Sequence, residues 1–235
     1  MRCRIRQLRL FAAAAALATA AALAAPASAT SISLSNVGIP GSPYPTGQHL
    51  IVDFNEGASA PPLYTLNNYP TLDANYTMSL GNATVGYQEG MPGYSGTLPN
   101  DATNYLTVIP NTTATLTRNS GYMTSFSFYM GSPDPYNYVT LHGLGGYTEV
   151  INGDTITASS PGGSTQEWSW GKRINLDFQG AKITSIDFTS GQIAFEVDNF
   201  AAASVPEPAT WGLMIAGFGG IGAVLRRRRQ TLVAA

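Results

Sequence analysis

An uncharged apolar segment near the C-terminus limits what this chain can fold into more than any other feature. Residues 209–225 carry no charge and run directly into Arg226, Arg227, Arg228 and Arg229. A helix of this length spans about 25 Å, slightly less than the roughly 30 Å hydrocarbon core of a bilayer. The arginine side chains can reach the interface and make up the difference. The segment therefore predicts a single transmembrane helix. The alternative, a buried helix of a soluble domain, does not need four arginines at its end.

The N-terminus has the layout of a secretory signal peptide. Residues 1–9 include four arginines, and residues 10–25 form an apolar run rich in alanine and leucine. Ala27-Ser28-Ala29 then supplies the small residues of a cleavage site, so we expect Thr30 to be the first mature residue. An uncleaved N-terminal membrane anchor is the alternative. Because basic clusters favour the cytoplasmic side, residues 30–205 are expected to lie across the membrane, outside the cytoplasm.

A short motif precedes the apolar segment. Pro206, Glu207 and Pro208 form the triplet Pro-Glu-Pro, and Trp211 follows it. With the four arginines, this order resembles the PEP-CTERM sorting signal of Gram-negative bacteria, in the variant with Trp after the triplet. The resemblance implies that the chain is the substrate of a host membrane exosortase, which removes the helix after export by the secretion machinery. It also implies delivery to the cell surface or to an exopolysaccharide matrix.

The predicted organisation is a signal peptide over residues 1–29, an ectodomain over 30–200, a linker over 201–205 and the sorting signal over 206–229. One further motif lies inside the last segment. Residues 217–222 match G-x-G-x-x-G, the dinucleotide fingerprint. That fingerprint needs a preceding strand and an acidic residue about 20 positions later, and no acidic residue follows Gly222. We therefore exclude nucleotide binding.

Charge and cysteine content restrict the ectodomain further. All 14 acidic residues lie between Asp53 and Glu207, against four basic residues over 30–208, which gives this part of the chain a net charge of −10. Such an acidic surface argues against nucleic-acid partners and is compatible with divalent cations. The single cysteine, Cys3, lies in the predicted signal peptide. An exported ectodomain without cysteine must be stabilised by burial of apolar surface, with or without a metal.

The ectodomain is rich in Thr, Ser, Asn, Gly and Tyr, and short alternating segments recur between turn residues. Several short strands at this spacing predict an all-β fold, an antiparallel β-sandwich. The candidate strands are residues 31–37, 50–54, 76–80, 105–109, 113–117, 125–130, 138–142, 147–151, 154–158, 166–170, 174–178, 183–189 and 193–197.

Two hairpins are expected among these strands. Asn152-Gly153 is a type I′ turn signal between residues 147–151 and 154–158. Ser190-Gly191 stands between residues 183–189 and 192–197. In the last strand, Ile193, Phe195 and Val197 are expected to face inward, and the alternating residues Ala194, Glu196 and Asp198 outward.

Acidic residues near the two ends of the ectodomain form the candidate metal site. Residues 50–56 read LIVDFNE and residues 195–200 read FEVDNF. This pair resembles the ends of jelly-roll carbohydrate-binding modules, in which the two terminal strands lie side by side and their acids share a structural calcium. We expect Glu56 and Asp198 to bind calcium, with help from Asp53 and Asn199, because calcium prefers six to eight oxygen ligands. The alternative is that these are solvated acids that discourage pairing at strand edges.

No catalytic constellation stands out. Neither His49 nor His142 has a nucleophile elbow or metal-ligand cluster around it in the sequence, and the 14 acids include no recognisable glycosidase pair. Aromatic side chains are candidates for stacking on sugars: Trp168 and Trp170, on one face of a strand, and Tyr64, Tyr69, Tyr87 and Tyr94. We expect a non-catalytic surface protein that binds exopolysaccharide or belongs to its matrix. A secreted hydrolase and a passive structural protein are the alternatives.

Overall fold

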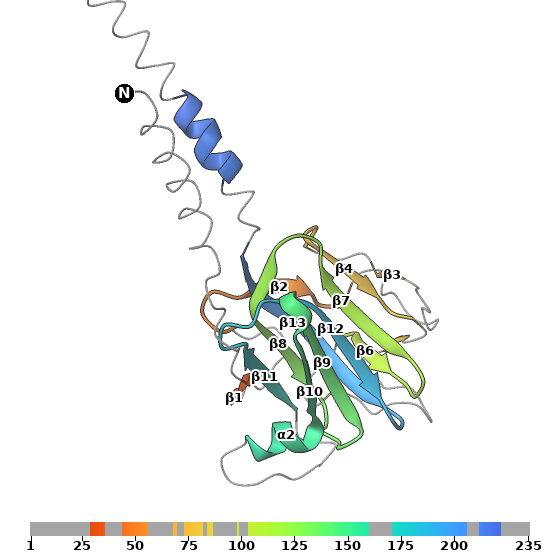
Figure 1. Ribbon diagram of the computed structural model, residues 1–235. Coiled ribbons are helices and arrows are strands. Elements are labelled where there is room, and N and C mark those ends of the chain that lie inside the picture. The colour runs from red at the N-terminus through yellow and green to blue at the C-terminus, as the bar shows by residue number, and fades with distance from the viewer. Residues whose placement is uncertain are drawn as a thin grey trace, which may run out of the picture.

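The computed structural model describes residues 29–35, 44–55, 68–69, 73–81, 84–86, 98, 103–159, 171–205 and 212–221. These residues form an antiparallel β-sandwich (Figure 1), so the expected fold class is confirmed. The candidate strand over residues 166–170, which contains Trp168 and Trp170, lies outside the described residues.

We call one layer sheet I. Its strands follow the order β1 (Ser31–Ser35), β11 (Lys172–Asp177), β8 (Tyr122–Met130), β13 (Phe195–Val205), β6 (Tyr105–Val108) and β5 (Thr84–Gly86). The C-terminal half of β13 also pairs with β2 (His49–Val52). Every one of these pairs is antiparallel. Strand β13 is therefore central, because it pairs with β8 along one side and with β6 and then β2 along the other.

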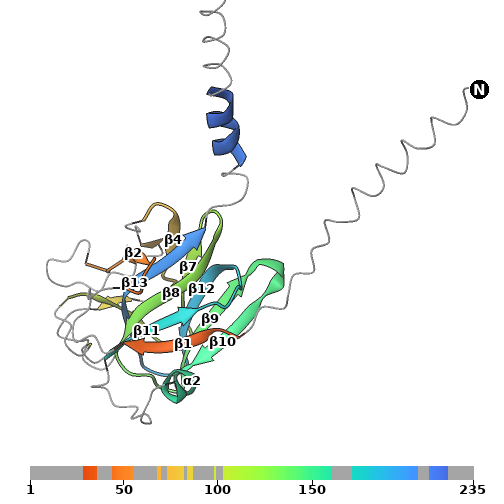
Figure 2. The same cartoon turned by 90° about the vertical axis from the view of Figure 1, so that its left-hand side faces the viewer.

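The other layer, sheet II, follows the order β10 (Thr148–Asn152), β9 (Asn137–Gly143), β12 (Ile183–Ser190), β7 (Thr113–Arg118), β4 (Tyr76–Ser79) and β3 (Asn68–Tyr69). A single bridge, Ile183 to Met123, connects the two sheets through β12 and β8. At one side of the sandwich, β1 of sheet I lies next to β10 of sheet II (Figure 2).

The core lies between the two sheets and is dominated by phenylalanine. Phe126 and Phe128 of β8 and Phe200 of β13 face Phe188 of β12. The rings of Phe188 and Phe200 stack across the layers with centroids 4.7 Å apart, and Phe54 meets Phe200 edge to face at 5.2 Å. Each fully buried phenylalanine contributes about 1.5–3 kcal/mol of transfer free energy. Burial of these rings can therefore stabilise an ectodomain without cysteine.

The expected hairpin at Asn152-Gly153 is wrong. Strand β10 ends at Asn152, and the short helix α2 (Gly153–Ala158) begins at the next residue. The Asn152 side-chain oxygen accepts a hydrogen bond from the backbone N–H of Thr155 at 3.0 Å. Asparagine is favoured both in type I′ turns and as a helix N-cap, and here it caps the helix. Strand β10 pairs with β9 instead.

The expected hairpin at Ser190-Gly191 is also wrong. Strands β12 and β13 follow each other in the chain but belong to sheets II and I, so the connection between them crosses the sandwich. Ile193, expected to face inward, is 52% exposed in this connection, whereas Ala194 is buried. Phe195 and Val197 do face the core.

The last strand is longer than the sequence indicated. Residues 201–205, expected to be a linker, are the final five residues of β13 and pair with β8. Beyond them the structure describes a helix over residues 212–221, inside the predicted transmembrane segment, and all of its residues are exposed. Within the described part of the chain, no helix combines the length and the hydropathy needed to cross a membrane.

Candidate functional site

The side of sheet I that points away from the core carries an unusual number of buried polar groups. We call it the polar face. Its side chains alternate with core residues along four strands: Tyr105 and Thr107 of β6, Ser127 and Tyr129 of β8, Arg173 and Asn175 of β11, and Glu196 and Asp198 of β13. Glu196 and Asp198, expected to face outward, are 8% and 0% exposed. The outward orientation was correct, but these two side chains are covered rather than open to water.

Arg173 is the centre of this face. Its side chain is 1% exposed, and its Nη1 donates to the Ser127 hydroxyl at 2.9 Å and to the backbone carbonyl of Asn199 at 3.1 Å. The guanidinium lies over the ring of Tyr44, 4.7 Å from the ring centroid. Burial lowers the pKa of Arg173, whereas Tyr44 and Asp198 act to raise it. A buried charge of this kind is tolerated only when hydrogen bonds and opposite charge surround it.

A chain of hydrogen bonds extends from Arg173 toward β2. The Ser127 hydroxyl, which accepts from Arg173, donates to the side-chain oxygen of Gln48 at 2.5 Å. The Gln48 amide nitrogen donates to the Ser125 hydroxyl at 3.0 Å. The chain thus joins β11, β8 and the residue just before β2. The other terminal nitrogen of Arg173, Nη2, is buried and has no hydrogen-bond partner among the described residues. It can donate to a water molecule or to an oxygen of a ligand.

The junction of β2 and β13 contains the residues proposed to bind calcium. The two strands do pair: Phe200 lies opposite Val52, and a register shift follows in β13. Just before it, Asn199 has a φ of 52°, and both Asp198 oxygens accept hydrogen bonds from Asn199, one from its backbone N–H at 2.7 Å and one from its side-chain amide at 2.6 Å. Sequence reasoning therefore correctly expected these two segments to be neighbours.

The donor set for calcium is only partly described. Asp53 accepts from the backbone N–H of Asn55 at 3.1 Å, and Glu56 lies outside the described residues. Two carboxylates fall short of the six to eight oxygens that calcium prefers. Among the described residues, no group of three or more His, Cys, Asp or Glu side chains is placed to hold a metal ion. A calcium ion completed by Glu56 stays a prediction.

Tyr44 connects this junction to Arg173. Burial raises the pKa of the Tyr44 phenol, Arg173 acts in the opposite direction, and the Asp53 and Asp198 carboxylates raise it further. Both carboxylates are therefore within electrostatic range of the ring that covers Arg173. No sequence signal pointed to Tyr44 or Arg173, because the segments that bring them together are about 130 positions apart in the chain.

Each histidine contacts one carboxylate. His49 lies 3.3 Å from Asp73, and His142 lies 3.0 Å from Asp187, both measured from Nε2 to Oδ2. Burial opposes ionisation of Asp73, but hydrogen bonds from Asn75 and His49 outweigh it and lower the pKa of the carboxyl. In the described part of the chain, neither imidazole is hydrogen-bonded to a serine or threonine hydroxyl. These contacts are ordinary surface pairs between neighbouring strands or loops.

Most of the aromatic residues that were candidates for stacking on sugars lie outside the described residues. Trp168, Trp170, Tyr64, Tyr87 and Tyr94 lie outside the described residues, and Tyr69 belongs to the two-residue strand β3. The sorting residues Pro206, Glu207, Pro208, Trp211 and the four arginines at 226–229 lie outside them as well. At the other end, Ala27 lies outside the described residues, whereas Ala29 and Thr30 lie inside them.

The C-terminal segment matches a known family model. The match is to the PEP-CTERM protein-sorting motif and covers residues 204–229, beginning in the last two residues of β13. The chain carries a PEP-CTERM protein-sorting motif. The PEP-CTERM motif marks an exported protein with a C-terminal sorting signal, as the sequence predicted. The match covers only this end of the chain and leaves the sandwich unassigned.

Solved structures similar to the sandwich are carbohydrate-binding modules. A family 11 module of a cellulosomal cellulase of Clostridium thermocellum is 14% identical, covering 63% of this chain and 98% of the module, with a TM-score of 0.29. A family 11 module from Clostridium thermocellum in complex with a β-1,3-1,4-mixed-linked tetrasaccharide is 14% identical. The match covers 68% of this chain and 98% of the module, with a TM-score of 0.31. A family 29 module is 10% identical, and the match covers 76% of this chain and 98% of the module, with a TM-score of 0.26. No curated protein matches the chain. At these scores the similarity carries no functional argument.

Proposed function

We propose that this chain is an exosortase substrate, exported through a cleavable signal peptide and released from its C-terminal helix to the cell surface or extracellular matrix. Its β-sandwich is non-catalytic and associates with exopolysaccharide. The PEP-CTERM motif at residues 204–229 is the observation that carries the proposal. Its partners are the secretion machinery, a membrane exosortase and a glycan, and neither nucleic acid nor nucleotide is among them.

The helix over residues 212–221 supports the membrane step. Its apolar side chains are not covered by the other described residues: Leu213, Ile215 and Phe218 are 70–76% exposed. Exposed apolar surface is unfavourable in water by about 25 cal/mol per Å², so these side chains need a lipid or protein environment. The motif begins in β13, the central strand of sheet I, so the sandwich is connected to the helix through its best-paired element.

The polar face supports the association with glycan. Hydroxyl, amide and guanidinium groups gather there around a partly exposed tyrosine ring, the combination that polyhydroxylated ligands require. At its accessible side, Tyr44 and Asn175 are partly exposed. Within the part of the chain that the structure describes, the side-chain oxygen of Asn175 has no hydrogen-bond partner. A sugar hydroxyl could donate to that oxygen while a pyranose face packs on Tyr44. The net charge of −10 favours a neutral or cation-bridged glycan over an acidic one.

Sorting is tested by replacing Pro206, Glu207 and Pro208 together with alanine and comparing cell fractions with those of the native chain. We expect the variant to accumulate in the membrane with its C-terminal helix intact. Gln230→Ala, beyond the arginines, is the matched control and is expected to be processed normally. Unchanged release of the triple-alanine variant contradicts the exosortase step.

Glycan association is tested with exopolysaccharide purified from the producing organism. We expect Tyr44→Ala to weaken binding severalfold and Tyr138→Ala to leave it unchanged, because Tyr138 is an exposed tyrosine on the opposite sheet. Release of reducing ends from the polysaccharide would instead identify a hydrolase. Neither binding nor turnover would leave a passive structural surface protein.

A further inference from the structure

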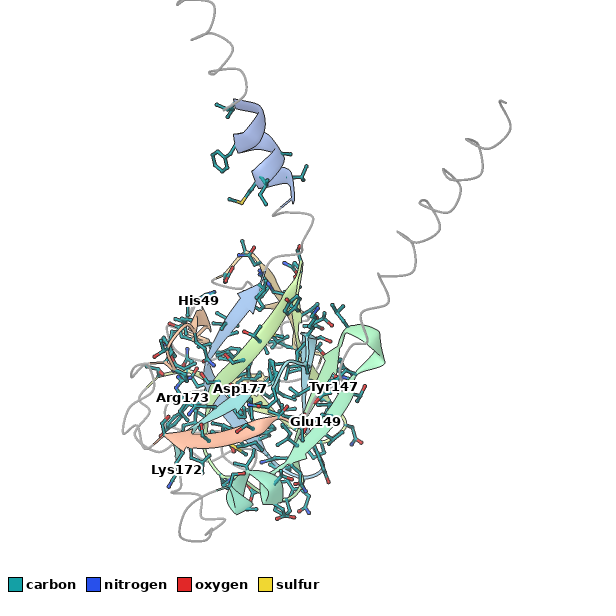
Figure 3. The ribbon with its side chains drawn as sticks, turned by 60° about the vertical axis from the view of Figure 1, so that its left-hand side comes forward. His49, Tyr147, Glu149, Lys172, Arg173 and Asp177 are labelled. Carbon is teal, nitrogen blue, oxygen red and sulfur yellow. The ribbon has the colours of Figure 1, made fainter. Side chains whose placement is uncertain are left out.

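Thr30 is hydrogen-bonded to the edge strand of sheet II. Its backbone nitrogen is 3.2 Å from each of the two carboxylate oxygens of Glu149, and its hydroxyl donates to Oε2 of the same group at 2.5 Å. The Tyr147 hydroxyl donates to that oxygen as well, also at 2.5 Å. Figure 3 shows Tyr147 and Glu149 beside β10, on the side next to β1.

This contact joins two strands that share no backbone pairing. Thr30 immediately precedes β1, which pairs with β11, whereas Glu149 belongs to β10, which pairs with β9. The Glu149 carboxylate therefore holds the two sheets together at one side of the sandwich. Glu149 and Thr30 are both partly buried, so water screens their interaction less than it would screen a fully exposed pair.

The geometry fits an amide through one hydrogen bond shared between two oxygens, and it suits an amine, which has more donors, better. In the uncut chain, the Thr30 amide has a single N–H, which it must share between two oxygens at equal distances. Hydrolysis of the Ala29–Thr30 bond by signal peptidase consumes one water and leaves a carboxylate on Ala29 and an ammonium on Thr30. An ammonium has three N–H donors and a positive charge, so it can bond both Glu149 oxygens at once. Such charge-assisted bonds are about twice as strong as neutral ones.

We infer that Glu149, with Tyr147, is the binding site for the new α-ammonium group of Thr30, so that removal of the signal peptide strengthens the existing contact between the start of β1 and β10. This inference rests on the proposed export and on cleavage after Ala29. The groups around the carboxylate agree with it. Burial raises the pKa of the Tyr147 phenol, and its hydrogen bond with Glu149 raises it further, so the phenol stays protonated and keeps donating to Glu149.

The test compares two forms of the chain that runs from the mature N-terminus to residue 235, purified in detergent. One form begins at Thr30, exposed by a protease that leaves no extra residue, and the other keeps Ala29 in front of it. The extension preserves the Thr30 amide and moves only the charge. We expect the Thr30 form to unfold about 2–4 °C higher, as about 1 kcal/mol shifts the midpoint of a domain of this size.

Three outcomes decide the inference. In E149Q, which keeps the shape of the side chain, the difference between the two forms should disappear. In Asp177→Asn it should persist, because Asp177 is an exposed acid on the neighbouring strand, opposite Ser31. Equal midpoints in the native pair, or a difference that survives E149Q, overturn the inference.

A second measurement avoids dependence on the folding of E149Q. Amine-specific acylation of the native Thr30 form should be severalfold slower at Thr30 than in the same protein unfolded in urea. Equal rates overturn the inference. Because both experiments use purified protein, they are independent of sorting: a failed coupling leaves the exosortase proposal standing. A mature N-terminus other than Thr30 in cell-surface protein removes the biological basis of the inference while leaving the C-terminal pathway intact.

Discussion

At the scale of single residues, Arg173 shows what the sequence could and could not reveal. Arginine at an alternating strand position, next to Lys172, is typical of a solvent-facing side chain. The structure buries it, because Tyr44 and the β13 segment around Asn199 cover that position. The neighbouring acid, Asp198, was singled out from its place near the end of the ectodomain. Its arginine neighbour was not, because nothing in the spacing of residues 173 and 198 indicates proximity.

Replacing Arg173 tests the polar face directly. Arg173→Met removes the donor for the Ser127 hydroxyl, which keeps its hydrogen bond to Gln48, and the donor for the buried Asn199 carbonyl. A buried acceptor that loses its donor costs about 1–3 kcal/mol. We expect the free energy of unfolding in urea to fall by at least that amount. Lys172→Met removes the same charge from the adjacent, partly exposed position and serves as the control. Equal stability of the two variants would show that the buried hydrogen bonds contribute nothing.

Tyr136 gives a prediction for high pH. Burial raises the pKa of this phenol to about 12, with further contributions from the Asp134 charge, a hydrogen bond to Asp134 and the Glu196 charge. The folded pKa is above the unfolded value of about 10. The stability from the neutral phenol is therefore fully present below pH 10 and is lost as the pH rises from about 10 through about 12.

Asp134→Asn removes the nearest carboxylate, so the pKa of Tyr136 should fall toward its ordinary value. Urea unfolding at pH 9 and pH 11 should then show a smaller loss of stability in this variant than in the native protein. Asp177→Asn, on the far strand β11, is the matched control and should follow the native protein. An identical decline in all three would mean that Asp134 does not set the pKa of Tyr136.

At the scale of elements, the positions of the strands were largely predictable and their connections were not. Alternation along residues 113–117 and 183–189 placed β7 and β12 correctly, because one side chain in two faces the core. Both hairpins failed for the same reason. A turn signal such as Asn152-Gly153 or Ser190-Gly191 marks a change of direction but does not say whether the next segment pairs locally, becomes a helix or crosses to the other sheet. Long-range packing decides that.

Gly153 explains how α2 can pack closely against residues 133–134. A Cβ added there would lie 2.1 Å from the carbonyl oxygen of Asp134, so only glycine allows α2 to approach the segment that follows β8. We expect Gly153→Ala to destabilise the protein by about 1–3 kcal/mol through overpacking. At Gly191, the added Cβ would make an ordinary contact of 3.5 Å with Tyr136, so Gly191→Ala should change stability little. Comparable urea midpoints for the two variants would contradict this account.

At the scale of the whole molecule, the ends of the chain were more predictable than its middle. Signal peptides and sorting motifs are recognised by linear sequence, so the PEP-CTERM segment needed no fold to be identified. The sandwich could be inferred as a class from its strand pattern. Its binding surface could not, because the polar face combines β6, β8, β11 and β13, and their order in the sheet follows from packing across the phenylalanine core.

Calcium is a prediction about the whole ectodomain, because it would join the β2 and β13 ends. We expect calcium to raise the thermal unfolding midpoint above that in chelator, since a ligand at a hundredfold its dissociation constant stabilises the folded state by about 2.7 kcal/mol. Glu56→Gln should abolish the increase, and Asp177→Asn, remote from this junction, should retain it. Identical unfolding curves of the native protein with calcium and with chelator would contradict the proposal. Arg173 would then be the positive charge that balances the acids at this junction.

The most direct test of the central claim is the intact mass of the protein recovered from the cell surface or culture medium. The account predicts a species that begins at Thr30 and ends before Trp211, without the apolar segment and the four arginines. A full-length species that retains residues 1–29 and 211–229 and is found dissolved in the cytoplasm would contradict it.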